Sequence, residues 1–188
     1  LNQELKEKIA LFCNIPANAV ISARDIQTTI YEIPLMYREE GLDNLVVQWF
    51  GLNNGQPDMR EWKKIVSAIK NPAKGPVRIA VVGKYIRLQD AYRSLYDAIS
   101  HGGIANKARV EIVPIHAEEV EKKGAETLLE SMDGVLVPWG FGKRGIQGKI
   151  SSIQYAREKQ IPFFGICLGM QCSVVEFARD LLQLKDAS

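Results

Sequence analysis

Residues 77–182 alternate between short apolar runs and amphipathic segments, and no other feature of the sequence constrains the fold as strongly. The apolar runs have the length and composition of buried strands and lie at 77–82, 109–115, 134–137 and 161–165. Amphipathic helices are expected at 90–100, 124–131, 148–159 and 168–182. Strict strand–helix alternation with short connections predicts an α/β fold. The expected architecture is a doubly wound parallel sheet with functional loops at the carboxyl ends of its strands.

The stretch around Cys167 has the pattern of a reactive site. An apolar run precedes the cysteine, Gly165 and Gly169 flank it, and apolar residues at helical spacing follow it. Strand, tight turn and helix with a nucleophile at the apex form a nucleophile elbow, in which glycines let the strand and helix approach closely. The N–H of Leu168 can hold a developing oxyanion, and the helix dipole favours the thiolate. A buried structural cysteine is the alternative, but the flanking glycines favour the nucleophile.

Residues 1–70 have a different pattern, made mostly of helices. Helices are expected at 1–13, 35–41, 42–49 and 59–70, a short strand at 20–22 and a loop at 53–57. The proline and glycine content of residues 71–76 indicates a linker. Too few strands are expected before this linker to close a sheet. The first part therefore differs in architecture from residues 77–188.

The bulk composition excludes several classes of protein. A net charge of +2 gives no nucleic-acid footprint, and no apolar run approaches the ~20 residues of a membrane span. The three cysteines are an odd number without C-x-x-C spacing, which argues against zinc and disulfides and suits a reducing cytoplasm. The start of the chain is no signal peptide and carries no methionine, so we expect a piece of a longer protein.

The segment 165–171, Gly-Ile-Cys-Leu-Gly-Met-Gln, resembles the nucleophile motif of the class I glutamine amidotransferases. Its continuation through Arg179 is similar to one branch of that class, the CTP synthase family. Residues 81–85 together with 90–92 resemble the opening of the glutaminase domain of that family. The resemblance implies a flavodoxin-like α/β sheet that is incomplete in this chain.

The first part of the chain also resembles the CTP synthase family. Residues 8–12 and 24–34 are similar to the end of its amidoligase domain, which other class I amidotransferases lack. The resemblance thus implies the C-terminal end of an amidoligase domain at 1–70, a linker at 71–76, and the N-terminal part of an amidotransferase domain at 77–188. It covers the whole chain but only part of a full-length family member, so we expect a fragment.

The activity implied by the resemblance is that of a ligase in pyrimidine nucleotide biosynthesis. Such an enzyme aminates UTP to CTP with ATP and with ammonia from glutamine hydrolysis. The resemblance further implies ATP with Mg²⁺ as cofactors, GTP as allosteric activator, CTP as inhibitor, and a cytoplasmic homotetramer. The sequence has no Gly-x-x-x-x-Gly-Lys-[Ser/Thr] phosphate loop. We therefore expect this chain alone to bind no nucleotide tightly. We also expect it to lack activity, because each of the two catalytic parts is incomplete in this chain.

The resemblance assigns the chemistry of glutamine hydrolysis to particular residues. Cys167 is the nucleophile, and Gly140 and Leu168 supply the two oxyanion N–H groups. The remaining glutamine-binding residues are Gly169, Met170 and Gln171. Arg144 and Gly145 belong to the lid that the resemblance links to GTP activation. We expect Cys13 and Cys172 to be packing residues.

The resemblance also implies nucleotide contacts in the first part of the chain. Lys8 would meet the pyrimidine triphosphate, and Phe12 would line the inhibitory CTP pocket. Arg24, Asp25 and Ile26 would border the adenine of ATP. Without the resemblance these residues read as a solvated lysine, a core phenylalanine and a polar turn.

The sequence departs from the family pattern at points that bear on glutamine hydrolysis. Trp139 replaces a glycine next to Gly140, and Gln147 replaces the usual glutamate of the lid. The family's catalytic His-x-Glu follows a strand far beyond the cysteine. The two histidines of this sequence, His101 and His116, lie elsewhere, and we expect both to face solvent.

These departures leave two other functions open. The first is a truncated, non-catalytic pseudo-glutaminase that acts as a binding or interaction module, which Trp139 and the missing histidine favour. The second is a single-domain α/β cysteine hydrolase that uses a different histidine, which residues 1–70 argue against.

Overall fold

The computed structural model describes residues 1–52, 55 and 57–188, so the loop expected at 53–57 lies partly outside the described residues. The chain divides into two compact units, Leu1–Pro72 and Ala73–Ser188. Each unit has its own internal packing and is described by itself.

The first unit is helical, as expected. Its elements are α1 (Gln3–Cys13), η1 (Ala17–Ala19), η2 (Ile30–Glu32), α2 (Ile33–Glu39), α3 (Leu42–Trp49) and α4 (Arg60–Lys70). The short strand expected at 20–22 is wrong, because residues 20–26 are in no strand. Ser22 shows the reason: its backbone N–H donates to the Glu40 carboxylate at 3.2 Å instead of to a neighbouring strand.

Helix α1 begins at a capped residue and exposes most of its apolar side chains. The side chain of Asn2 accepts the N–H of Leu5, and Asn14 ends the helix in the left-handed conformation. Ala10 is the one buried residue of the helix, whereas Phe12 is 80% exposed. A core position for Phe12 is therefore wrong in this chain.

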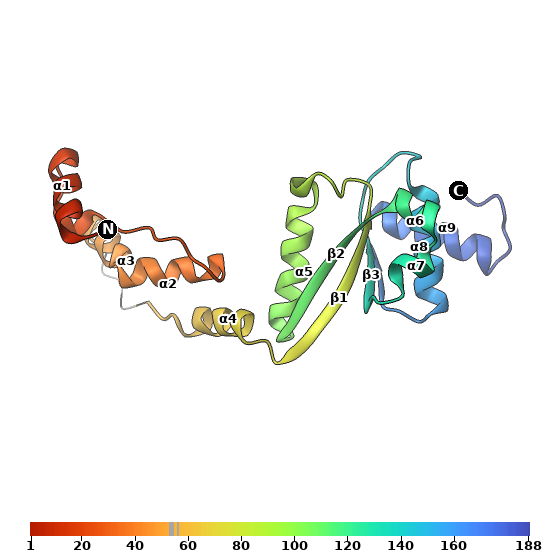
Figure 1. Ribbon diagram of the computed structural model, residues 1–188, viewed down its shortest axis with the longest axis horizontal. Helices are drawn as coiled ribbons and strands as arrows, with labels where there is room; N and C mark the ends of the chain where they lie inside the picture. The colour runs from red at the N-terminus through yellow and green to blue at the C-terminus, as the bar shows by residue number, and fades with distance from the viewer. Residues whose placement is uncertain (53–54, 56) are drawn as a thin grey trace. The chain divides into compact units, whose positions relative to one another are not determined.

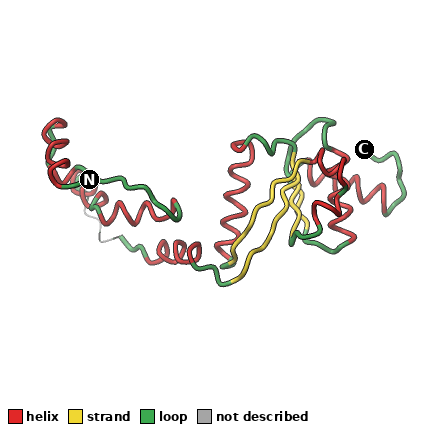
Figure 2. The backbone as a smooth tube through the Cα atoms, in the orientation of Figure 1, coloured by secondary structure: helices red, strands yellow, loops and turns green. Residues whose placement is uncertain are grey.

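The second unit contains a four-stranded parallel sheet (Figure 2). The strands are β1 (Lys74–Gly83), β2 (Ala108–His116), β3 (Gly134–Val137) and β4 (Phe163–Gly165), in the order β2-β1-β3-β4. All four expected strands are present. Strand β1 begins three residues earlier than expected, inside the segment read as a linker, and β4 begins only after Pro162, whose nitrogen has no hydrogen to donate.

Helices cover both faces of this sheet, so the fold is doubly wound as predicted (Figure 1). They are η3 (Gln89–Tyr92), α5 (Arg93–Ala105), α6 (Ala117–Lys123), α7 (Ala125–Leu129), α8 (Ile146–Glu158) and α9 (Leu168–Asp180). Helix α5 lies on one face, and α6 to α9 lie on the other. Sequence reasoning missed α6, although Glu118 and Glu119 in its first turn and Lys122 and Lys123 in its last complement a helix dipole.

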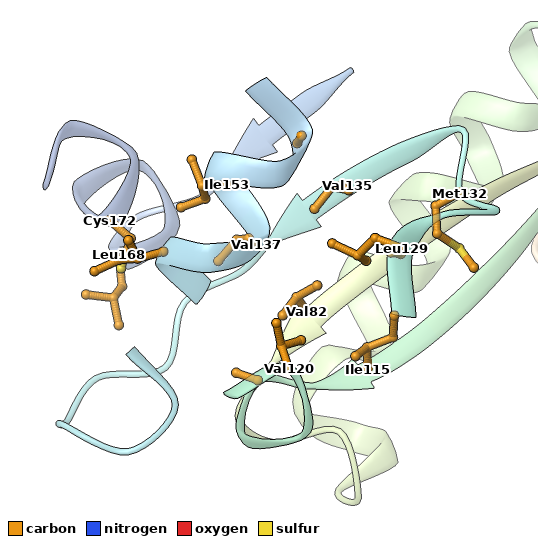
Figure 3. Packing of buried hydrophobic residues seen from close by; sticks show 14 residues of the cluster. Val82, Ile115, Val120, Leu129, Met132, Val135, Val137, Ile153, Leu168 and Cys172 are labelled. Atoms are coloured by element: carbon orange, nitrogen blue, oxygen red, sulfur yellow. The ribbon is translucent and has the colours of Figure 1, made fainter. Parts of the chain in front are cut away.

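Two apolar clusters hold the helices to the sheet. The larger lies between the sheet and helices α6 to α9 and includes Leu129, Val137 and Leu168 (Figure 3). The smaller lies on the α5 face around Val81 and Tyr92. Together they fix the ends of the strands from which the site is built.

Candidate active site

The site lies where the carboxyl ends of neighbouring parallel strands meet. In the sheet, Val137 at the end of β3 pairs with Gly165 at the end of β4, and β1 runs on the other side of β3. The loop after β3 and the turn after β4 therefore start side by side. Loops at this edge of a doubly wound sheet are its usual ligand sites.

Cys167 occupies a strained, exposed turn between β4 and α9. Its φ and ψ angles are 54° and −108°, a conformation that residues with a Cβ rarely adopt. Both flanking glycines are sterically required. A Cβ on Gly165 would lie 2.6 Å from the carbonyl carbon of Gly169, and a Cβ on Gly169 would lie 1.9 Å from the Val137 oxygen. This is the geometry of a nucleophile elbow.

The start of α9 presents a hydrogen-bond donor beside the thiol. In the described part of the chain the N–H of Leu168 donates to no acceptor, whereas the N–H of Gly169 is used by the Ile166 carbonyl at 3.0 Å. A free N–H at a helix N-terminus is suited to an anion. Met170 and Gln171 follow on the exposed side of this first turn.

The loop after β3 carries the second expected donor, Gly140. Its φ of +141° is one that favours glycine. Trp139 beside it takes no positive φ. The indole of Trp139 packs edge-on against Tyr92, with ring centroids 5.5 Å apart, in the cluster on the α5 face.

The lid residues pack on the start of α6. Arg144 forms an ion pair with Glu118 at 3.0 Å. Gly145 has a φ of +77°, and a Cβ there would lie 2.9 Å from that of Ala117. Gln147 is exposed. The helix that holds this loop is the one that sequence reasoning missed.

Neither histidine lies beside Cys167. His101 is exposed on α5. His116 ends β2, three strands away from β4, which corresponds to about 14 Å across the sheet. The expectation that His116 faces solvent is wrong, because its Nε2 is buried and has no hydrogen-bond partner among the described residues.

The three cysteines differ in environment. Cys172 is buried in the larger cluster, as expected, and burial raises the pKa of its thiol. Cys13 is exposed on α1, so its expected packing role is wrong in this chain. Cys167 and Cys13 are thus the accessible thiols of the described residues.

In the first unit the structure brings together three of the five expected nucleotide contacts. Arg24, Asp25 and Ile26 line a pocket of about 320 Å³ with Glu32 and Glu39. With more carboxylates than cations, this pocket suits the edge of a base rather than a triphosphate. It does not include the other two expected contacts, which are exposed on α1. No cluster of described side chains could hold a metal ion.

Sequence reasoning gave no site role to two buried polar residues that hold the loop after β3. Tyr92 is fully buried, and its hydroxyl hydrogen-bonds the loops after β1 and β3. Lys149 on α8 is fully buried, and its ammonium donates to the carbonyls of Pro138 and Gly140. A lysine in an otherwise ordinary amphipathic helix gives no sequence signal for such a position.

Two family profiles each match one segment of the chain. Residues 87–188 match the profile of the class-I glutamine amidotransferases, and residues 1–52 match that of the CTP synthase N-terminus. Since the first match spans more than half of the chain, the protein belongs to the class-I glutamine amidotransferase family.

Relatives named CTP synthase match the chain along its whole length. The protein from Carboxydothermus hydrogenoformans is 53% identical and that from Geotalea uraniireducens 49% identical, and the chain spans 35% of the length of each. The glutaminase domain of the Trypanosoma brucei CTPS, solved with bound acivicin, superposes with a TM-score of 0.55 at 41% identity. That match covers 58% of this chain and 43% of the other.

None of the described helices is long and apolar enough to cross a membrane.

Proposed function

We propose that this chain is part of a CTP synthase, a cytoplasmic ligase that forms CTP from UTP with ATP and with ammonia released from glutamine. In this proposal 1–70 is the end of the amidoligase domain, 71–76 the linker and 77–188 the first part of the glutaminase domain. The observation that carries the glutaminase assignment is the strained, exposed Cys167 between two sterically required glycines. The likeness to CTP synthases over the whole chain supports the assignment of the two parts.

The proposed reaction begins at Cys167. Its thiolate attacks the side-chain carbonyl carbon of glutamine, a C–S bond forms, and the carbonyl oxygen becomes an oxyanion held by the N–H groups of Leu168 and Gly140. Collapse of this intermediate expels ammonia once its nitrogen is protonated. Water then cleaves the thioester to release glutamate. The ammonia is the nitrogen source for the amination of UTP.

Cofactors and effectors belong to the whole enzyme in this proposal. Arg24, Asp25 and Ile26 would border the adenine of ATP, and Arg144 and Gly145 would belong to a lid that responds to GTP. Lys8 and Phe12 would take part in binding UTP and the inhibitor CTP. Mg²⁺ would bind with ATP and supply charge neutralisation at its phosphates. The parent would be a homotetramer.

The chain alone should hydrolyse glutamine poorly, because no histidine lies beside Cys167 in the described residues. General acid–base help is worth about 10²–10⁴-fold. Ammonia release should be measured for this chain, for a version extended through the His-x-Glu segment of a close relative, and for the extended version with Trp139→Gly. We expect negligible, partial and greater release in that order. Robust release by the first version would contradict the assigned site.

A non-catalytic pseudo-glutaminase is the second candidate. The bulky indole of Trp139 beside Gly140, fixed against Tyr92, is the observation that favours it. If the extended version with Trp139→Gly still releases no ammonia, this second candidate replaces the first.

A further inference from the structure

The turn after β3 is anchored through its backbone carbonyls. Four consecutive carbonyl oxygens accept hydrogen bonds from side chains: Pro138 and Gly140 from Lys149 at 3.3 and 3.5 Å, Trp139 from Tyr92 at 3.1 Å, and Phe141 from Lys84 at 2.6 Å. The donors come from three separate places, namely the loop after β1, η3 and α8. With every carbonyl held, the peptide planes of the turn have little freedom to rotate.

Tyr92 is the centre of this arrangement. Its side chain is 0% exposed, and its hydroxyl accepts the N–H groups of Lys84 and Tyr85 at 3.2 and 3.4 Å while it donates to the carbonyl of Trp139. Burial raises the pKa of the phenol, so the hydroxyl keeps the proton that it donates. One hydroxyl thus joins the loop after β1 to the loop after β3.

Lys149 approaches the same turn from the other face of the sheet. Its side chain is 0% exposed and forms no ion pair with a carboxylate of the described residues. Burial lowers the pKa of its ammonium, the nearby charge of Lys84 lowers it further, and the thiols of Cys172 and Cys167 act in the opposite direction. A buried ammonium without a carboxylate is costly. Its hydrogen-bond acceptors are carbonyls of the turn, so the buried ammonium holds the backbone of that turn in place.

The direction of the Gly140 N–H follows from the Tyr92 contact. The carbonyl of Trp139 and the N–H of Gly140 belong to one trans peptide group and point in opposite directions. The carbonyl is directed toward Tyr92, in the cluster on the α5 face. The N–H is therefore directed away from that cluster.

The turn and the elbow are in contact at their starts. The carbonyl of Val137, just before the turn, accepts the N–H of Ile166 at 2.9 Å, and Gly169 packs closely on the same carbonyl. Cys167 lies between these two residues. The Gly140 N–H, which is fixed in the turn, is thus held at a constant position relative to Cys167.

We propose that Tyr92 and Lys149 are positioning residues: together they hold the Pro138–Phe141 carbonyls so that the Gly140 N–H is preorganised for the oxyanion formed at Cys167. This inference rests on the proposed glutamine hydrolysis and specifies how its second oxyanion donor is held. Neither residue touches the substrate. Both act through the turn.

Two cysteine reagents separate this role from general structural support. With the chloromethyl ketone analogue of glutamine, the thiolate adds to the ketone and forms an oxyanion. The carbonyl then re-forms as the bond between sulfur and the carbonyl carbon breaks, sulfur bonds to the neighbouring carbon, and chloride leaves. With iodoacetamide the thiolate displaces iodide directly, and no oxyanion arises. The ratio of the two labelling rates at Cys167 therefore reports the oxyanion donors and not the thiol alone.

The variants are Tyr92→Phe, which keeps the buried ring, and Lys149→Met, which keeps an unbranched side chain. Tyr96→Phe is the matched control, because Tyr96 packs on Tyr92 at 6.2 Å while its hydroxyl makes no hydrogen bond among the described residues. Labelling of the full 188-residue chain is followed by peptide mass spectrometry. The exposed Cys13 is the internal reference for each reagent.

The ratio should fall about tenfold in Tyr92→Phe and Lys149→Met, short of the ~10²–10³-fold effect of losing an oxyanion donor altogether. It should stay unchanged in Tyr96→Phe. An unchanged ratio in Tyr92→Phe and Lys149→Met, with selective ketone labelling of Cys167 in the parent chain, overturns the positioning role and leaves the proposed function standing. If the ketone labels Cys167 of the parent chain no faster than Cys13, both inferences fail.

Discussion

At the scale of single residues, the backbone of Cys167 sets its exposure and its reactivity. The positive φ turns the thiol outward at the start of α9, while Cys172 five residues later faces the core. A nucleophile that must meet a substrate carbonyl has to be accessible. The strain of such a conformation, of order 1–3 kcal/mol, is sustained by the close packing of Gly165 and Gly169.

Alkylation by iodoacetamide at neutral pH should therefore label Cys167 first, Cys13 more slowly and Cys172 last. The first two thiols are exposed, but only Cys167 lies in a strained turn at a helix N-terminus, beside the N–H of Leu168 that donates to no acceptor among the described residues. Burial and its raised pKa protect Cys172. A time course read by peptide mass spectrometry gives the order. Faster labelling of Cys13 or Cys172 would contradict the elbow assignment.

Glu40 ties α1 to the extended segment that follows it. Its carboxylate accepts Lys6 Nζ at 2.8 Å and the N–H of Ser22 at 3.2 Å, and these bonds lower its pKa from 4.5 to about 2. A carboxyl whose pKa is depressed by folding contributes stability above its unfolded pKa and loses that contribution as the pH falls. The contribution should disappear between about pH 4.5 and 2.

An NMR titration of the Glu40 carboxyl tests this contact. The midpoint should lie near pH 2 in the parent chain and rise in Lys6→Met, because the Lys6 hydrogen bond is the largest cause of the shift. Lys8→Met, on the same helix but exposed, should leave the midpoint unchanged. A midpoint near 4.5 in the parent chain would show that the contact is not formed in solution.

The sequence motif is enough to predict the elbow but not the residues that support it. A nucleophile elbow requires residues without a Cβ on both sides of the nucleophile, so the Gly-x-Cys-x-Gly spacing identifies Gly165, Cys167 and Gly169 from sequence. Tyr92 and Lys149 act through contacts between residues far apart in the chain. No local pattern records such contacts, so these roles required the structure.

At the scale of elements, the paired glycines of α5 show why helix ends are hard to predict. The helix was expected to end at residue 100, before Gly102 and Gly103, yet α5 continues to Ala105. Gly103 is needed for close packing on the sheet, since a Cβ there would lie 2.6 Å from Cγ2 of Val110 and 3.0 Å from the Ala108 oxygen. A Cβ on Gly102 would meet nothing within 4 Å.

The two glycines should respond oppositely to alanine. Gly102→Ala should stabilise the chain by about 0.5–1 kcal/mol, because alanine loses less backbone entropy in a helix. Gly103→Ala should destabilise it by about 1–3 kcal/mol through overpacking. Chemical denaturation of both variants gives the free energies of unfolding. Equal effects of the same sign would mean that α5 does not pack on β2 as described.

The strands of the sheet were predicted well from their apolar runs, whereas helix α6 was missed and the strand expected at 20–22 was wrong. The four strands read as short, mostly apolar runs, which the sequence shows directly, although only β3 is buried along its whole length. Helix α6 is short and mostly charged, and its buried face consists of only Ala117 and Val120. Two apolar residues are too few to show a helical period. The apolar run at 20–22 was misread because burial alone does not make a strand.

At the scale of the whole chain, an apolar stripe runs along the exposed side of α9. It consists of Met170, Val174, Phe177 and Leu181, spaced at helical intervals and each roughly half exposed. Contiguous exposed apolar surface of this kind marks an interaction site or an aggregation liability. The alternation of strands and helices predicted α9 and its first residue. The side of α9 that is buried depends on packing partners elsewhere in the fold, which the apolar spacing within the helix cannot identify.

The isolated chain should therefore self-associate at high concentration, and Val174→Lys should reduce that association. The substitution places a charge in the middle of the stripe without touching the buried residues of α9. Leu88→Lys is the matched control, because Leu88 and Val174 are 63% and 62% exposed and Leu88 lies in the loop after β1, away from α9. Sedimentation velocity over a concentration series should show a lower average mass for Val174→Lys and no change for Leu88→Lys. A parent chain that stays monomeric, or an equal effect of both lysines, would mean that the stripe does not drive association.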